Sequence, residues 1–279
     1  MSAAATFDAA AIRSASPIAE LRERQPALAA AGFAFLALFA VASALQLFDG
    51  RTLDGVSVWT KPAKFFLSTG VFLLTSAWFF GYVRPDRRDA PALRWSVRIV
   101  IAAGVFELGY ITLQAGLGER SHFNRADAAH FWLYGAMGAA ALTMLLTKIP
   151  LALEIWRRPV RGLDPTLRLA VVAGIALTVV LGALSGLYMS QQYGAGHNVG
   201  AVGGATPLFG WNRAGGDLRV AHFFGMHGEQ LLPVVAALTT GAFGALGSRR
   251  LVIAAGVAIA AITVAVFAQA VMGQAFPLG

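Results

Sequence analysis

Residues 215–233, GGDLRVAHFFGMHGEQLLP, carry His222, His227 and Glu229 into the start of an apolar run. Imidazoles ligate haem iron and zinc and exchange protons near neutral pH, and a carboxylate can bind a metal or carry a proton. An ionisable side chain that faces lipid costs at least about 2.5 kcal/mol, so such residues usually face the protein interior and serve a function. These residues therefore predict a polar site inside a membrane helix.

A second polar set, Glu107, Tyr110 and Gln114, follows the spacing i, i+3, i+7, which stacks the side chains on one helix face. Glu107 and Glu229 are each predicted to lie about 15 Å inside a span, near the midplane. We predict that the two carboxyls approach each other, or approach His227 and Tyr110, in one pocket that opens only outward. Glu107, Glu229 and Tyr110 are the predicted catalytic residues. The alternative is that each carboxyl makes its own hydrogen bond and has a structural role only.

The composition excludes a soluble protein. The chain has 279 residues, of which 57% are hydrophobic and 13% charged, with a mean hydropathy of +0.64. Soluble domains carry about 25% charged residues. We predict an all-α transmembrane bundle, with residues 1–26 as a cytoplasmic segment and 27–279 as a single domain. Its seven predicted spans are 27–48, 63–83, 96–117, 128–149, 167–189, 220–243 and 251–272.

The net charge of +8 is explained by topology rather than by nucleic-acid binding. Of the 22 Lys and Arg residues, 15 fall in the segments on the N-terminal side of the membrane and 7 on the other side. Such an excess marks the cytoplasmic side, so we predict a cytoplasmic N-terminus and an external C-terminus. The absence of cysteine excludes disulfides, thiolate-held iron–sulfur clusters and thioether-attached haem.

Two pairs of spans resemble each other. ELGYITLQAG (107–116) aligns without gaps with SGLYMSQQYG (185–194), and DAAHF is matched downstream by DLRVAHF. We predict that the third and fourth spans and the fifth and sixth spans are parallel repeats of one helical hairpin, related by an axis along the membrane normal. The repeat places His130 and His222 at equal depth.

A b-type haem or metal centre in a redox protein is the leading functional hypothesis. His130 and His222 would be the two axial ligands of haem b. Gly135, Gly138, Gly225 and Gly228 would leave room for the macrocycle. Because no second histidine pair lies deeper, the sequence implies at most one haem.

Three alternatives stay open. The first is a metal-dependent hydrolase of a lipid-like substrate, with His130, His222 and His227 as ligands of zinc or another divalent metal and Glu229 or Glu107 as the base. The second is a proton-coupled transporter with both carboxyls as proton carriers. The third is an accessory subunit with a structural polar network. In each case we expect the lipid bilayer as surroundings and a small-molecule, lipid or redox partner on the periplasmic side.

The segments WTKPAKF, GERSHFN and GGDLRVAHFF resemble a family of multi-pass proteins from bacterial genomes. The resemblance extends over the whole chain. It implies a location in the bacterial inner membrane, and it brings no known activity with it.

Overall fold

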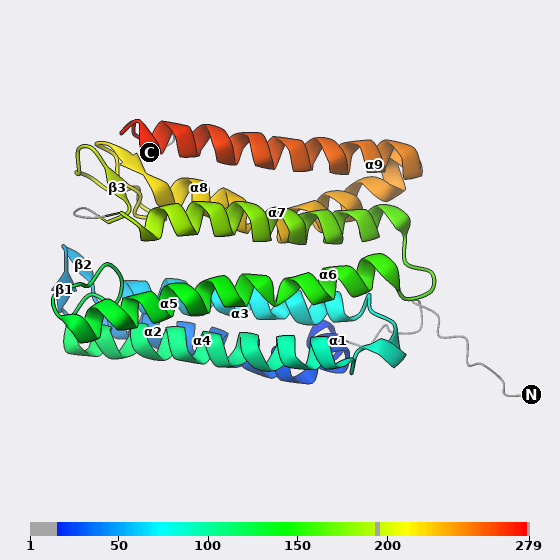
Figure 1. The fold of residues 1–279 in the computed structure, drawn as a ribbon, viewed down its shortest axis with the longest axis horizontal. Helices are drawn as coiled ribbons and strands as arrows, with labels where there is room; N and C mark the ends of the chain where they lie inside the picture. The colour runs from blue at the N-terminus through cyan, green and yellow to red at the C-terminus, as the bar shows by residue number, and fades with distance from the viewer. Residues whose placement is uncertain (1–15, 193–195, 278–279) are drawn as a thin grey trace, which may run out of the picture. The chain divides into compact units, whose positions relative to one another are not determined.

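A computed structural model describes residues 16–192 and 196–277 of the chain. The chain is mostly helical and forms two compact units, Met1–Leu163 and Asp164–Gly279 (Figure 1). Six helices are long and apolar enough to cross a membrane. The prediction of a multi-pass helical membrane protein is therefore confirmed at this level. Most of the predicted cytoplasmic segment, residues 1–15, lies outside the described residues.

Unit 1 begins with a short helix, α1, capped by Ser16 and packed on the end of a longer one. The Arg24 guanidinium donates a 2.6 Å hydrogen bond to the Trp78 carbonyl and lies 4.1 Å from the Trp78 ring centroid. The elements of this unit are α1 (Pro17–Arg24), α2 (Pro26–Phe48), β1 (Thr52–Leu53), β2 (Val56–Ser57), α3 (Thr60–Phe80), a 3₁₀ turn (Pro85–Arg87), α4 (Pro91–Leu117), α5 (Ala128–Leu146) and α6 (Lys148–Arg157).

The connections of unit 1 gather at its two ends. At one end, Asp54 and Gly55 take positive φ values in the β1–β2 turn, as a tight hairpin requires. Arg120 pairs with Asp54 at 2.6 Å, which joins this hairpin to the loop after α4. At the other end, Arg87 pairs with Glu154 at 2.8 Å. The four long helical segments of this unit therefore run alternately up and down.

Unit 2 contains α7 (Pro165–Ser190), β3 (Asn198–Val199), β4 (Gly216–Asp217), α8 (Leu218–Met226) and α9 (Gly228–Val271). The 44 residues of α9 are interrupted at Gly244, which has φ 63° and ψ 175°, and the chain turns back there (Figure 1). Leu232 and Ala236 before the turn share a core cluster with Val252 and Ile259 after it. The predicted sixth and seventh spans both include residues of α9.

Two predicted spans are broken at points that the sequence periodicity does not show. The fourth span divides into α5 and α6 at Thr147, and the helical chain continues to Arg157. The sixth divides into α8 and α9 at His227, whose φ of −96° and ψ of 5° are not helical. The second break separates the two ionisable residues that were predicted to share one continuous helix, His222 and Glu229.

Candidate functional site

The polar stripe of α4 is inside unit 1. Glu107 is 6% exposed, and Tyr110 and Gln114 are also buried. Tyr110 shares an apolar cluster with Ile111 and Met137. Among the described residues, neither Glu107 Oε1 nor the Tyr110 hydroxyl has a hydrogen-bond partner, although both atoms are buried. An unsatisfied buried polar group costs about 1–3 kcal/mol, so these two atoms on one helix face are the candidates on α4 for contact with a bound polar species.

The stripe continues outward as a chain of hydrogen bonds at the end of unit 1 that is predicted to be periplasmic. Gln114 donates to Glu119 Oε2 over 3.2 Å, and the same oxygen lies 3.2 Å from His130 Nε2. The other ring nitrogen, His130 Nδ1, lies 2.7 Å from Asp127 Oδ2. Asp127 also caps α5 by accepting from the His130 amide. This amide and then the imidazole hold the pKa of Asp127 below its ordinary value.

His122 lies beside this chain and was not among the predicted site residues. Its ring centroid is 5.3 Å from that of Phe65 and 6.1 Å from that of Tyr134. Burial, and secondarily the positive charge of Lys61, hold the pKa of His122 well below its ordinary value, so the ring is neutral. The positive charge of Lys61 also interacts with the Glu107 carboxyl group. No sequence signal marks His122 as a site residue, because a histidine beside aromatic residues in an outer loop is common at a membrane interface.

His222 is held between α7 and α8 of unit 2. Its Nδ1 lies 3.1 Å from Ser185 Oγ, and that hydroxyl donates to the Leu181 carbonyl over 2.6 Å. Because the hydroxyl has one proton and gives it to the carbonyl, the imidazole Nδ1–H donates to Ser185. The remaining nitrogen, Nε2, is then an acceptor. The ring lies against Gly186, where an added Cβ would come within 3.2 Å of Cε1.

Glu229 is fully buried in the first turn of α9. Its Oε1 accepts a 3.2 Å hydrogen bond from Gln230, and its amide donates to the hydroxyl of Thr178 on α7. His227, at the helix break, has its ring centroid 4.5 Å from that of Phe223. Sequence reasoning missed Thr178 because a lone hydroxyl in an apolar span is usually bonded within its own helix.

The structure brings together only part of the predicted site. Glu107 lies with Tyr110 in unit 1, and His227 lies beside Glu229 in unit 2. The predicted meeting of the two glutamates joins residues of different units and stays a prediction. The predicted His130–His222 pair also joins residues of different units and likewise stays a prediction.

The histidines fit a haem unequally. His222 has its Nδ1 bonded to Ser185, as a metal-ligating imidazole commonly does, and keeps Nε2 as an acceptor. His130 does not fit as it stands, because both ring nitrogens lie beside carboxylates. The predicted room at Gly225 and Gly228 is wrong. Side chains and backbone of α7 fill it, and added Cβ atoms would lie 3.0 Å and 3.2 Å from the nearest side-chain carbons.

The zinc hypothesis requires three ligands in one place. Within the described residues, no group of three or more histidine, aspartate or glutamate residues is arranged to hold a metal ion. Of the three predicted ligands, His130 belongs to unit 1, whereas His222 and His227 belong to unit 2.

No protein-family model, curated protein or solved structure matches the chain.

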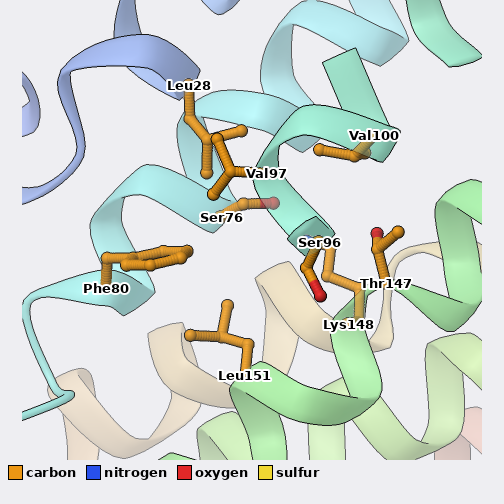
Figure 2. Close-up of a pocket in the computed structure, with 9 residues that line it drawn as sticks. All are labelled: Leu28, Ser76, Phe80, Ser96, Val97, Val100, Thr147, Lys148 and Leu151. Carbon is orange, nitrogen blue, oxygen red and sulfur yellow. The ribbon is translucent and has the colours of Figure 1, made fainter. Parts of the chain in front are cut away.

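A cavity of about 10 Å³ lies in unit 1 near the N-terminal end of α4, whereas the Glu119–His130 chain is at the C-terminal end, and the cavity has room for about one water molecule. Lys148, Ser76, Ser96 and Thr147 supply its polar lining (Figure 2). Lys148 is only 2% exposed, and its Nζ lies 3.8 Å from the Phe72 ring centroid. The sequence counts Lys148 among the 15 basic residues on the predicted cytoplasmic side, and the structure packs its side chain inside the unit.

The glycine-rich connection before α8 is anchored by one carboxylate. Asp217 is buried, accepts from the Asn212 amide over 2.9 Å and pairs with Arg219 at 2.6 Å. Burial raises the pKa of Asp217, but the hydrogen bond and charge of Arg219 outweigh this and hold the pKa below its ordinary value. Sequence reasoning singled out Asp217 only as part of the repeat.

Proposed function

We propose that the protein is a proton-coupled membrane transporter in which Glu107 exchanges a proton with the predicted periplasmic face. The observation that carries the proposal is the pair of buried polar atoms, Glu107 Oε1 and the Tyr110 hydroxyl, which lack a partner among the described residues. A carboxyl in this position can take up and release a proton, and a water or hydronium ion between the two groups would satisfy both.

The residues outward of Glu107 support a route for that proton. Tyr110 stands one turn above it, and Gln114 stands one turn further, where it bonds to Glu119. Glu119 in turn contacts His130, whose ring can hold a proton on either nitrogen. From Gln114 outward, the steps to Glu119 and His130 are hydrogen-bond contacts, and they end at side chains that are partly exposed. Between Glu107 and Gln114 the route requires a bound water or hydronium ion to connect the side chains.

Infrared spectroscopy can test the proposal without a known substrate. The purified protein in lipid nanodiscs is titrated with pH while the carbonyl stretch of protonated carboxyl groups is recorded. We expect Glu107→Gln to remove one titrating carboxyl band without unfolding the protein. Glu154→Gln is the matched control, because Glu154 is paired with Arg87 at the other end of the unit. A wild-type spectrum from Glu107→Gln would overturn the proposal.

We also propose seven spans in the bacterial inner membrane, with a cytoplasmic N-terminus and a periplasmic C-terminus. At 1.5 Å per residue, the 44 residues of α9 would extend about 66 Å, roughly twice the hydrocarbon thickness. The turn at Gly244 supports two spans in this helix. The predicted repeat is supported by its aspartates, because Asp127 caps α5 and Asp217 caps α8.

A b-type haem in a redox role is the second candidate, favoured by the orientation of His222 by Ser185. Haem would supply electron transfer, and Ser185 would fix the ring that ligates it. The absorption spectrum of the purified protein tests this candidate. A haem absorption band that disappears in His222→Ala would favour it over the transporter, whereas a spectrum without such a band would reject it.

A further inference from the structure

The interruption between α8 and α9 is bridged by a single hydroxyl group. In a continuous helix, the Glu229 amide would bond to the Gly225 carbonyl, and the Gln230 amide would bond to the Met226 carbonyl. Here the Gln230 amide donates instead to the His227 carbonyl, over 3.2 Å. Thr178 Oγ1 accepts from the Glu229 amide over 3.0 Å and donates to the Met226 carbonyl over 3.3 Å. The Thr178 hydroxyl thus replaces the Gly225 carbonyl as the acceptor for the Glu229 amide, and the Gln230 amide as the donor to the Met226 carbonyl.

Close backbone contact makes this bridge possible. Thr178 is 0% exposed and stands one turn after Gly174 on α7. A Cβ added at Gly174 would lie 2.8 Å from the Gly228 carbonyl oxygen and 2.9 Å from Glu229 Cα. Only a glycine there lets α7 approach the break closely enough for the threonine to enter the hydrogen-bond ladder. On the far side, Pro233 has no N–H to give to the Glu229 carbonyl.

The break changes the surroundings of Glu229. As the second residue of α9, its carboxylate lies where amide groups and the helix dipole favour negative charge. In an unbroken helix the same side chain would lie mid-helix, with no such stabilisation. The hydroxyl of Thr178 therefore determines whether a buried carboxyl has a helix end beside it.

We propose that Thr178 is a positioning residue for a second proton-binding carboxyl, Glu229. The threonine keeps α8 and α9 as separate helices, and the buried N-terminal end of α9 favours the ionised form of Glu229 inside the unit. Proton binding converts this carboxylate to the acid and changes no other covalent bond. The inference concerns unit 2 and does not depend on the route proposed from Glu107.

Carbodiimide modification, which requires a protonated carboxyl, provides the test. The full-length protein in nanodiscs is treated over a range of pH, and modification at Glu229 is quantified by mass spectrometry. In Thr178→Val, which has a similar shape but no hydroxyl, we expect the helices to join. Modification of Glu229 should then persist to higher pH by roughly half a unit to one unit, the size of a helix-terminus effect. Thr178→Ser keeps the hydroxyl and should retain the wild-type profile.

Glu107 serves as an internal control in the same samples, because its profile should not change in either variant. A wild-type Glu229 profile in folded Thr178→Val would overturn the inference, as would an equal shift in Thr178→Ser. If the valine variant does not fold, Thr178→Ala is measured against the same criteria. A failure of the Glu107 proposal would instead appear as an unchanged carboxyl spectrum in Glu107→Gln.

Discussion

At the scale of single residues, Asp217 gives a pH-dependent prediction. Asp217→Asn removes the charge of the carboxylate that accepts hydrogen bonds from Arg219 over 2.9 Å and 2.6 Å. Hydrogen bonds to charged groups contribute about 1.5–3 kcal/mol each to stability. We expect faster amide hydrogen exchange across residues 196–217. Because the pKa of Asp217 is lowered in the folded protein, its contribution is fully present above the ordinary value of 3.8. It is lost as the pH falls through the lower folded value, so wild type and variant should differ at neutral pH and converge in acid.

Asp54→Asn is the matched control, since Asp54 also pairs with an arginine but is exposed. Faster exchange to the same extent in both variants would contradict a special role for Asp217.

The sequence predicted the burial of Glu107, Tyr110 and Gln114 because their spacing repeats with the helix. It could not predict Thr178, whose two partners lie about fifty residues away and whose segment has no polar period.

At the scale of elements, the contact between α7 and the α8–α9 break predicts different outcomes for two glycines. Gly174→Ala would place a Cβ against backbone atoms that cannot rotate away, and overpacking of this kind costs about 1–3 kcal/mol. Gly135→Ala on α5 meets nothing within 4 Å and should be close to neutral. Thermal unfolding in detergent measures both. Equal stability of the two variants would show that the close approach at Gly174 is not required.

Helix positions were largely predictable from apolar run length, because about 20 apolar residues must cross the bilayer. The described helices α2, α3, α4 and α7 agree with the predicted spans to within a few residues. The exact positions of the breaks at Thr147 and His227 were not predicted, because polar residues such as Lys148 and Glu229 next to them occur in unbroken helices as well. The hydroxyl that bridges the break at His227 comes from another helix, which a pattern within one segment does not show.

At the scale of the whole molecule, the turn at Gly244 predicts which surfaces are exposed on each side of the membrane. The chain has no cysteine, so a single introduced cysteine reports one position without background. Ala245 and Ala201 are both exposed, the first beside the turn in α9 and the second in the connection before α8. If α9 contains two spans, Ala245 faces the cytoplasm and Ala201 the periplasm.

An impermeant maleimide should therefore label Ala201→Cys in intact cells and Ala245→Cys only in inverted vesicles. The physical basis is the excess of Lys and Arg on one side, to which Arg249 and Arg250 next to the turn contribute. Lys148 does not contribute as a surface charge, because it is buried in unit 1. Labelling of both cysteines from the same side would remove the seventh span. It would place the C-terminus in the cytoplasm and leave six spans, the number of helices that are long and apolar enough to cross.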